Sequence, residues 1–209
     1  MKEKICLVTG VGPGTGSSMV KRFSKGGYRV LMLSRSKKRL SDLEKEVPNS
    51  KSFPCDVSQE KDMEKIIQKI KKEEGIPEVL VHNAVRGSRG NFLEIKPKDL
   101  LKNFEINTMG LLYLARGFSK EMVERGSGSI VVTGNTSARR GKSWFANTAP
   151  TKAAQRILAE SMARELGPKG VHVSYVLIDA VIDLTWTRNI WTDKPDSFFI
   201  QPQAIAEEV

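Results

Sequence analysis

A glycine-rich turn at residues 9–16 constrains the fold of this chain more than any other feature of its sequence. The turn directly follows the apolar run at residues 5–8 and directly precedes a helical segment. Glycine lets the backbone turn tightly and approach a pyrophosphate, while the following helix points amide hydrogens and its positive dipole end at the phosphates. This context predicts a dinucleotide site, with a purely structural glycine turn as the alternative. The predicted site residues are Gly10, Gly12, Gly14, Thr15 and Gly16.

Short apolar runs alternate with amphipathic segments along the chain. The alternation predicts an α/β fold in which a parallel sheet carries helices on both faces, and continuous β-branched runs are typical of strands buried on both sides. No repeat or long linker interrupts the pattern, so we expect one domain over residues 1–209. Strands are expected at residues 5–8, 30–33, 79–81, 130–132 and 171–177 and around Phe53, and helices at about 63–70, 100–123 and 148–166.

The composition excludes several classes of protein. No apolar run approaches the roughly 20 residues of a bilayer-spanning helix, and the apolar run that begins at Ile5 leaves no room for a signal peptide. We therefore expect a cytoplasmic protein with no membrane partner. The formal net charge is +10, but no basic run is interleaved with aromatic residues. This pattern favours a solvated basic surface over a nucleic-acid partner.

Cysteine and histidine are too few to suggest a metal site. Cys6 and Cys55 lie in separate apolar stretches and are expected to be reduced core thiols. His82 and His172 are the only histidines, and neither a CxxC nor an HExxH motif occurs, so we expect no metal. Two interpretations of His82 stay open: an imidazole that titrates near neutral pH beside a cofactor, or a buried imidazole held by hydrogen bonds.

The end of the second predicted strand indicates which dinucleotide binds. NAD-binding relatives of this fold place a carboxylate there to hold the ribose 2′-hydroxyl, whereas this chain has Ser34 and Arg35. A guanidinium can pair with a 2′-phosphate, and the missing carboxylate removes a repulsion. The pattern therefore favours NADP(H) over NAD(H). The alternative is that Arg35 only faces solvent.

Further motifs follow the later strands. Asp56-Val57 and Asn83-Ala84 come after the third and fourth strands, and residues 164–173 lead into the sixth. With the glycine turn, these segments resemble the short-chain dehydrogenase/reductase family over nearly the whole chain. The resemblance implies a single Rossmann-like doubly wound parallel sheet with the strand order 3-2-1-4-5-6. It also implies that Asp56-Val57 contacts the adenine and that Asn83-Ala84 belongs to the family's Asn-Asn-Ala-Gly element.

The resemblance implies a catalytic set from which this chain departs. Asn107 matches the family asparagine that kinks a long helix and supports a proton-relay water, and Lys152 matches the lysine that holds the nicotinamide ribose. The family tyrosine stands four residues before that lysine, where this chain has Thr148, and the family serine thirteen residues before the tyrosine, where it has Asn135. A threonine hydroxyl is a far weaker acid than tyrosine, whose pKa is about 10. The family's standard proton transfer is therefore not supported.

The segment after the sixth strand also departs from the family. Ile182 keeps the apolar position that contacts the cofactor carboxamide, but Asp179 and Asp183 are acids without family counterparts. Asp179 is a candidate acid or base if the fold buries it, and capping of a loop or helix is the alternative. In relatives this segment forms a lid, so aromatic residues here indicate a substrate wall, an oligomer contact or plain packing. These aromatic residues are Trp186, Trp191, Phe198 and Phe199.

Residues 202–209 resemble two turns of a helix with no strand after it, so we expect a C-terminally truncated domain without a seventh strand. Two functions stay open. The first is an NADP(H)-dependent oxidoreductase that acts on a small carbonyl compound, alcohol or conjugated alkene through a non-standard proton donor. The second is a catalytically silent NADP(H)-binding sensor or structural module. The resemblance further implies a homodimer or homotetramer formed through helices at about 97–124 and 148–166.

Overall fold

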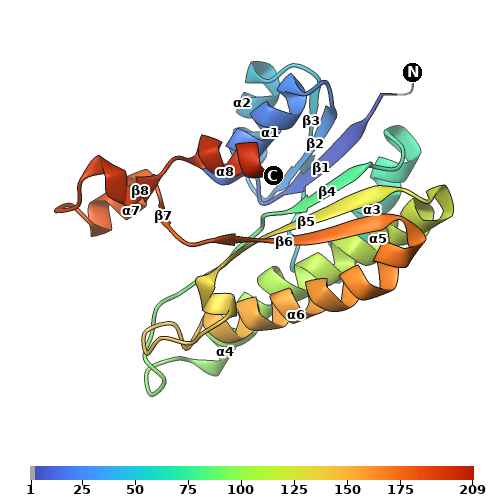
Figure 1. The fold of residues 1–209 in the computed structure, drawn as a ribbon. Helices are drawn as coiled ribbons and strands as arrows, with labels where there is room; N and C mark the ends of the chain where they lie inside the picture. The colour runs from blue at the N-terminus through green and yellow to red at the C-terminus, as the bar shows by residue number, and fades with distance from the viewer. Residues whose placement is uncertain (1–2) are drawn as a thin grey trace.

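A six-stranded parallel sheet lies at the centre of the protein, in a computed structural model that describes residues 3–209 (Figure 1). The order is β3-β2-β1-β4-β5-β6 and every neighbouring pair is parallel, which confirms the expected doubly wound topology. All strands therefore end at the same edge, where ligands of such sheets bind. The strands are β1 (Ile5–Thr9), β2 (Arg29–Ser34), β3 (Ser50–Pro54), β4 (Val79–His82), β5 (Gly128–Asn135) and β6 (Val171–Ile178).

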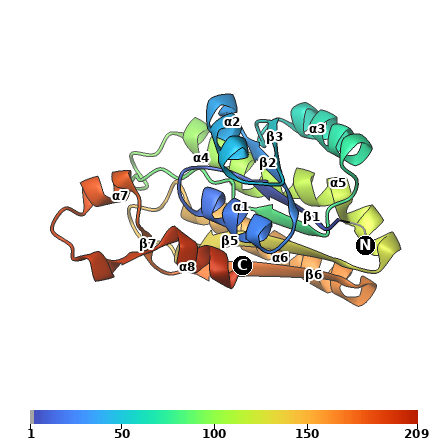
Figure 2. The same ribbon diagram turned by 90° about the horizontal axis from the view of Figure 1, so that it is seen from above.

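Helices cover both faces of the sheet (Figures 1 and 2). One face carries α1 (Thr15–Lys25), α2 (Lys37–Glu46) and α8 (Pro202–Glu208). The other carries α3 (Glu60–Glu73), α5 (Gly110–Arg125) and α6 (Ala149–Leu166), with α4 (Pro97–Phe104) at one end of this layer. This arrangement confirms the prediction of helices on both faces.

The apolar core is divided by the sheet into two layers. Along β1, Ile5 and Leu7 pack toward α3 and α5, whereas Cys6 and Val8 pack toward α1 and α2. The strand is therefore buried on both sides, which explains its unbroken apolar sequence. The buried thiols of Cys6 and Cys55 are free and belong to opposite layers, as expected for separate core cysteines.

The long helix predicted at residues 100–123 is interrupted. A π-helical turn, η1 (Glu105–Met109), separates α4 from α5 and contains Asn107, the residue at which the family resemblance implies a kink. Such a turn widens the helix by one residue and is frequent at functional sites. Gly126 ends α5 in the left-handed conformation with a φ of 66°.

Beyond β6 the chain leaves the sheet and returns. A short parallel pair, β7 (Val181–Ile182) and β8 (Phe199–Ile200), encloses the helix α7 (Thr185–Ile190), and α8 then packs beside α1. The sequence did not predict β7 and β8, because two residues carry no readable periodicity. Within residues 3–209 the main sheet ends at β6. Across these same residues, no helix is both long and apolar enough to cross a bilayer.

Candidate functional site

The glycine turn after β1 is built around two close backbone contacts. Gly10 has a φ of 70°, and a Cβ there would lie 2.4 Å from the backbone of Ala84. A Cβ on Gly16 would lie 2.5 Å from the carbonyl oxygen of Gly10. Only glycine fits at these positions, because β1, the turn and the start of α1 pack directly onto the end of β4. For Gly10 and Gly16 the structural explanation is therefore sufficient.

Gly12 is different, because the space beside it is open. A Cβ on Gly12 would meet nothing closer than the Gly10 carbonyl oxygen at 4.0 Å. Within the described chain, no side chain caps the first turn of α1, whose N-cap is Gly14 and whose first residue is Thr15. Open space in front of uncapped helix amides leaves room and positive polarity for a pyrophosphate. The turn therefore fits a dinucleotide.

The opposite side of the turn is covered by the segment after β7. The side chain of Leu184 lies against Gly14, where a Cβ would be 2.5 Å from a Leu184 methyl carbon. Ile182, the predicted carboxamide contact, packs in the same layer of the core as β1 and α1. The segment that follows β6 is thus placed beside the dinucleotide turn.

Two polar side chains at the end of β2, those of Ser34 and Arg35, are not used by the protein itself in the part of the chain that the structure describes. Arg35 is exposed and forms no ion pair within residues 3–209. The Ser34 hydroxyl is buried and has no hydrogen-bond partner in the described structure. Buried polar groups are normally paired, so a free hydroxyl beside an unpaired guanidinium fits a polar or anionic ligand group.

Asp56 and Asn83, which the resemblance assigns to the cofactor, also hold the protein together. Asp56 Oδ1 accepts hydrogen bonds from the Ser58 amide at 3.1 Å and the Ser58 hydroxyl at 2.8 Å. Asn83 Nδ2 donates to the Gly10 carbonyl at 3.0 Å, and its Oδ1 accepts from the Thr133 hydroxyl at 3.0 Å. Asn83 therefore ties the glycine turn to β5.

Asn107 is fully buried and anchors two segments. Its Oδ1 accepts from the Arg86 amide at 2.9 Å, and its Nδ2 donates to the Arg86 carbonyl at 2.8 Å and to the Thr151 hydroxyl at 2.9 Å. The side chain thus fixes the loop after β4 against the start of α6. The π-helical turn places Asn107 for this role.

Lys152 points into the protein. It is 2% exposed, and its Nζ donates to the Thr133 carbonyl at 3.1 Å and to Gln155 Oε1 at 2.8 Å. Burial lowers the pKa of Lys152 to about 7. Gln155 Nε2 in turn donates to the Asn107 carbonyl at 2.5 Å. The sequence analysis did not predict a role for Gln155. Its position one helical turn after Lys152 was the signal that could have indicated a hydrogen bond to that lysine.

Thr148 and Asn135, which the resemblance assigns to the family tyrosine and serine positions, make local structural hydrogen bonds. The Thr148 hydroxyl donates to the Ser88 carbonyl at 2.9 Å and accepts from the Ser88 amide at 3.1 Å. Asn135 Oδ1 accepts from the Ser137 amide at 3.1 Å and caps the short helix η2 (Thr136–Ala138). Thr148 therefore holds the loop after β4 instead of pointing a free hydroxyl toward a substrate.

The structure decides between the interpretations of the acids and of His82. Asp179 is exposed, so the burial on which its acid–base role depends is absent. Hydrogen bonds from Arg188 and then Gln201 lower the pKa of Asp183 to about 2, so that this side chain is an ionised anchor of the lid segment. His82 Nδ1 shares a 3.2 Å hydrogen bond with the Thr9 hydroxyl, whereas its buried Nε2 has no hydrogen-bond partner within the described residues, so the imidazole is paired on one side only. Burial, followed by the nearby Lys152, lowers the pKa of His82 to about 3, so titration near neutral pH was wrong.

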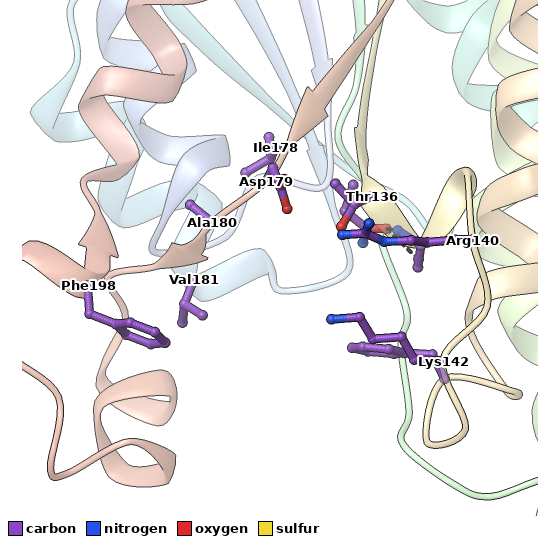
Figure 3. A pocket seen from close by; sticks show the side chains of 11 residues that line it. Thr136, Arg140, Lys142, Ile178, Asp179, Ala180, Val181 and Phe198 are labelled. Carbon is purple, nitrogen blue, oxygen red and sulfur yellow. Dashed lines mark hydrogen bonds between the residues drawn. The ribbon is translucent and has the colours of Figure 1, made fainter.

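A cavity of about 410 Å³ lies where β5 and β6 end (Figure 3). Its volume is within the range of small-molecule sites. Of the aromatic residues in the lid segment, Phe198 lines the cavity, Phe199 is buried and Trp186 is 60% exposed. The Arg89 guanidinium stacks over Trp191, 5.0 Å from the ring centroid. This contact joins the loop after β4 to the segment between β7 and β8. The lining residues are Asn135, Thr136, Ser137, Arg140, Lys142, Phe145, Ile178, Asp179, Ala180, Val181 and Phe198.

Comparison with known proteins finds the same arrangement elsewhere. A family model described as short chain dehydrogenase matches residues 4–192. L-xylulose reductase from Cavia porcellus is 29% identical over 188 residues, covering 90% of this chain and 75% of that protein. 2,3-Dihydro-2,3-dihydroxybenzoate dehydrogenase from Bacillus subtilis (strain 168) is 26% identical over 199 residues, covering 93% of this chain and 76% of that protein. The solved structure of ElxO with NADP bound superposes with a TM-score of 0.89 at 26% identity, over 99% of this chain and 89% of that one.

Proposed function

The chain belongs to the short-chain dehydrogenase family, and from that membership we propose that it is an NADP(H)-dependent oxidoreductase. The proposed substrate is a small carbonyl compound, an alcohol or a conjugated alkene. When bound, the nicotinamide supplies or accepts the hydride. The protein's own residues bind and orient the reactants and control access of water. We further propose that residues 1–209 form one nucleotide-binding domain.

One observation carries the choice of cofactor: the open, uncapped turn at Gly12 lies at the same edge of the sheet as the unpaired Arg35. In the proposed complex the turn holds the pyrophosphate through backbone amides, and Arg35 holds the 2′-phosphate with the Ser34 hydroxyl beside it. No carboxylate stands at this strand end to favour a free 2′-hydroxyl. The NADP bound to ElxO supports the same choice.

The proton in the proposed reaction comes from water in the cavity. Thr148 has both hydrogen-bonding directions of its hydroxyl committed to Ser88, and Asp183 is ionised well below neutral pH. Lys152 already donates to Thr133 and Gln155, so two of the three N–H groups of its ammonium are used within the protein. The exposed side of the cavity, at Asp179, admits water to the substrate.

A fluorescence titration with NADPH and, separately, NADH tests the cofactor assignment. We expect NADPH to bind at least about tenfold more tightly, because only NADPH carries the phosphate that Arg35 pairs with. Arg35→Gln removes this preference and leaves NADH binding unchanged. Lys25→Gln is the matched control, since Lys25 is an exposed cation at the far end of α1. Equal binding of both dinucleotides, or a comparable loss in the control, would refute the assignment.

The silent NADP(H)-binding module is the second candidate, and the closed bonding of Thr148 and Lys152 favours it. Lys152→Met separates the two functions. Loss of turnover with NADPH affinity retained indicates the enzyme, whereas loss of affinity in a protein that turns over none of a panel of ketones, aldehydes and enones indicates the module. A melting temperature measured on the same samples shows that each variant is folded.

We also propose that the protein is a homodimer or homotetramer in a reducing, cytoplasmic environment. Leu101 on α4 and Ile157 on α6 are 61% and 50% exposed, so apolar surface is available on the helices that pair in the family. Both cysteines are free and buried, which suits a reducing compartment. Sedimentation of the wild type and of Ile157→Lys tests the pairing, and a monomeric wild type would contradict it.

A further inference from the structure

One wall of the cavity at the ends of β5 and β6 is basic. Arg140 and Lys142, from the loop between η2 and α6, both line the cavity and both point into it (Figure 3). Each residue is exposed, and neither side chain forms an ion pair or hydrogen bond with the rest of residues 3–209. By contrast, Arg156 and Arg164 of α6 and Arg188 of α7 are paired with acids. The two cations in the cavity are thus available to a ligand.

The facing wall carries a single acid. Asp179, which follows β6, lies across the cavity from Arg140 (Figure 3), and the structure records no ion pair between them. Two cations and one anion leave the lining with a formal charge of +1. A guanidinium binds a carboxylate through two parallel hydrogen bonds, and an ammonium adds a second point charge. A ligand group with one negative charge neutralises this net charge.

Four apolar side chains also line the cavity. Ile178 ends β6 and Val181 follows it, while Phe145 and Phe198 come from the loop before α6 and from the segment after β7. These side chains offer an apolar surface beside the two cations. The same segment contacts the glycine turn through Leu184, which places the cavity next to the proposed cofactor site.

We propose that this cavity binds a small monocarboxylate whose carboxylate pairs with Arg140 and Lys142 and whose apolar body packs on Phe198 and Val181. This inference rests on the proposed function for the assignment of a reacting carbonyl, and it narrows the substrate to a carbonyl compound that carries one carboxylate. Asn135, Thr136 and Ser137 add polar groups to the same wall.

Calorimetric titrations with paired probes test the inference without requiring turnover. The probes are pyruvate, 2-oxobutanoate and phenylglyoxylate, each with its neutral methyl ester, and dihydroxyacetone phosphate as a dianion. We expect at least one acid to bind about tenfold more tightly than its ester, with an affinity that falls as salt is raised. Equal binding of acids and esters, binding of none of the acids, or tighter binding of the dianion would overturn the proposal.

Charge variants locate the effect. Arg140→Gln and Lys142→Gln should each weaken binding of the preferred acid about fivefold and leave binding of its ester unchanged. Arg139→Gln is the matched control, because Arg139 adjoins Arg140 but does not line this cavity; Arg140 and Lys142 also border the neighbouring hollow that Arg139 lines. A similar loss in Arg139→Gln would show a general surface-charge effect and would refute the assigned pair.

The same protein distinguishes failure of this inference from failure of the proposed function. If NADPH does not bind but the acid preference and its variants behave as expected, the proposed function fails and the carboxylate site stands. If NADPH binds and acids show no preference, the cofactor assignment stands and the carboxylate site fails. NADPH oxidation followed with the preferred acid and its ester then shows whether the bound acid is reduced.

Discussion

The two halves of the site differ in how many of their polar groups are already used. Around the glycine turn, Gly12 borders open space, and Ser34 and Arg35 have no partners in the described structure. Around α6, by contrast, Thr148 and Lys152 are buried and hydrogen bonded within the protein. The polar side-chain groups of the first half are therefore available to a ligand. The second half is closed, because the polar groups of Thr148 and Lys152 are already used in hydrogen bonds within the protein.

Substitution of the turn glycines should give the largest changes in stability and in NADPH affinity, and so tests this comparison most strongly. Gly10→Ala should lower the free energy of unfolding by about 4 kcal/mol or more, because its Cβ meets the Ala84 backbone and its φ is positive. For Gly12→Ala, the free energy of unfolding should stay within about 0.5 kcal/mol of the wild-type value. NADPH binding should weaken about tenfold, since the new Cβ enters the open space where the pyrophosphate is proposed to bind. Urea unfolding and NADPH titration measure the two effects. An unchanged NADPH affinity in Gly12→Ala would show that the open space beside Gly12 does not hold a phosphate.

The closed half should be visible in the pH dependence of stability. The folded-state pKa of Lys152 is about 7, below its ordinary value of 10.5, so between these values the unfolded chain holds a proton that the folded chain lacks. The free energy of unfolding therefore gains a contribution that rises with pH over this window, by a few kcal/mol at most. Below about pH 7 both states are protonated at Lys152, and the contribution stays constant at its least favourable value.

Lys152→Met should remove that rise, and Lys25→Met, at an exposed lysine of α1, should keep it. Urea unfolding of the three proteins at intervals from pH 6 to pH 10 measures the difference. Parallel curves for wild type and Lys152→Met would mean that Lys152 is charged in the folded protein throughout, and that the closed network does not suppress its ionisation.

Thr148→Val gives the smallest effect and the sharpest test of function. The change removes the bonds to Ser88, so the free energy of unfolding should fall by about 1–2 kcal/mol. Turnover per folded molecule should stay within about twofold of the wild type, because the hydroxyl has no chemical role in the proposed reaction. Steady-state kinetics at saturating NADPH measures this. A large fall in kcat with stability unchanged would make Thr148 a catalytic residue after all.

Local sequence patterns predicted the fold well, and they also gave the predicted cofactor residues. Apolar runs such as residues 5–8 predict strands buried on both faces, and the strand–turn–helix position of residues 9–16 predicts the dinucleotide turn, because both depend on neighbouring residues. The sequence did not separate the roles of the glycines. Gly10 is required by the backbone of Ala84, whereas Gly12 leaves a hollow, and this difference depends on a strand more than 70 residues away in the chain.

Only the tertiary structure decided what the unusual residues do. Thr148 bonds to a loop 60 residues earlier, Gln155 bridges Lys152 and the Asn107 carbonyl 48 residues away, and Asp183 is held by Arg188 and Gln201. From the sequence alone, the family resemblance implied only that Thr148 and Asp183 differ from the family pattern. Their hydrogen-bond partners and burial are set by packing between distant segments, and burial in turn sets which groups titrate. Sequence periodicity does not predict contacts between distant segments. The hydrogen bonds around α6 could therefore be identified only in the folded protein.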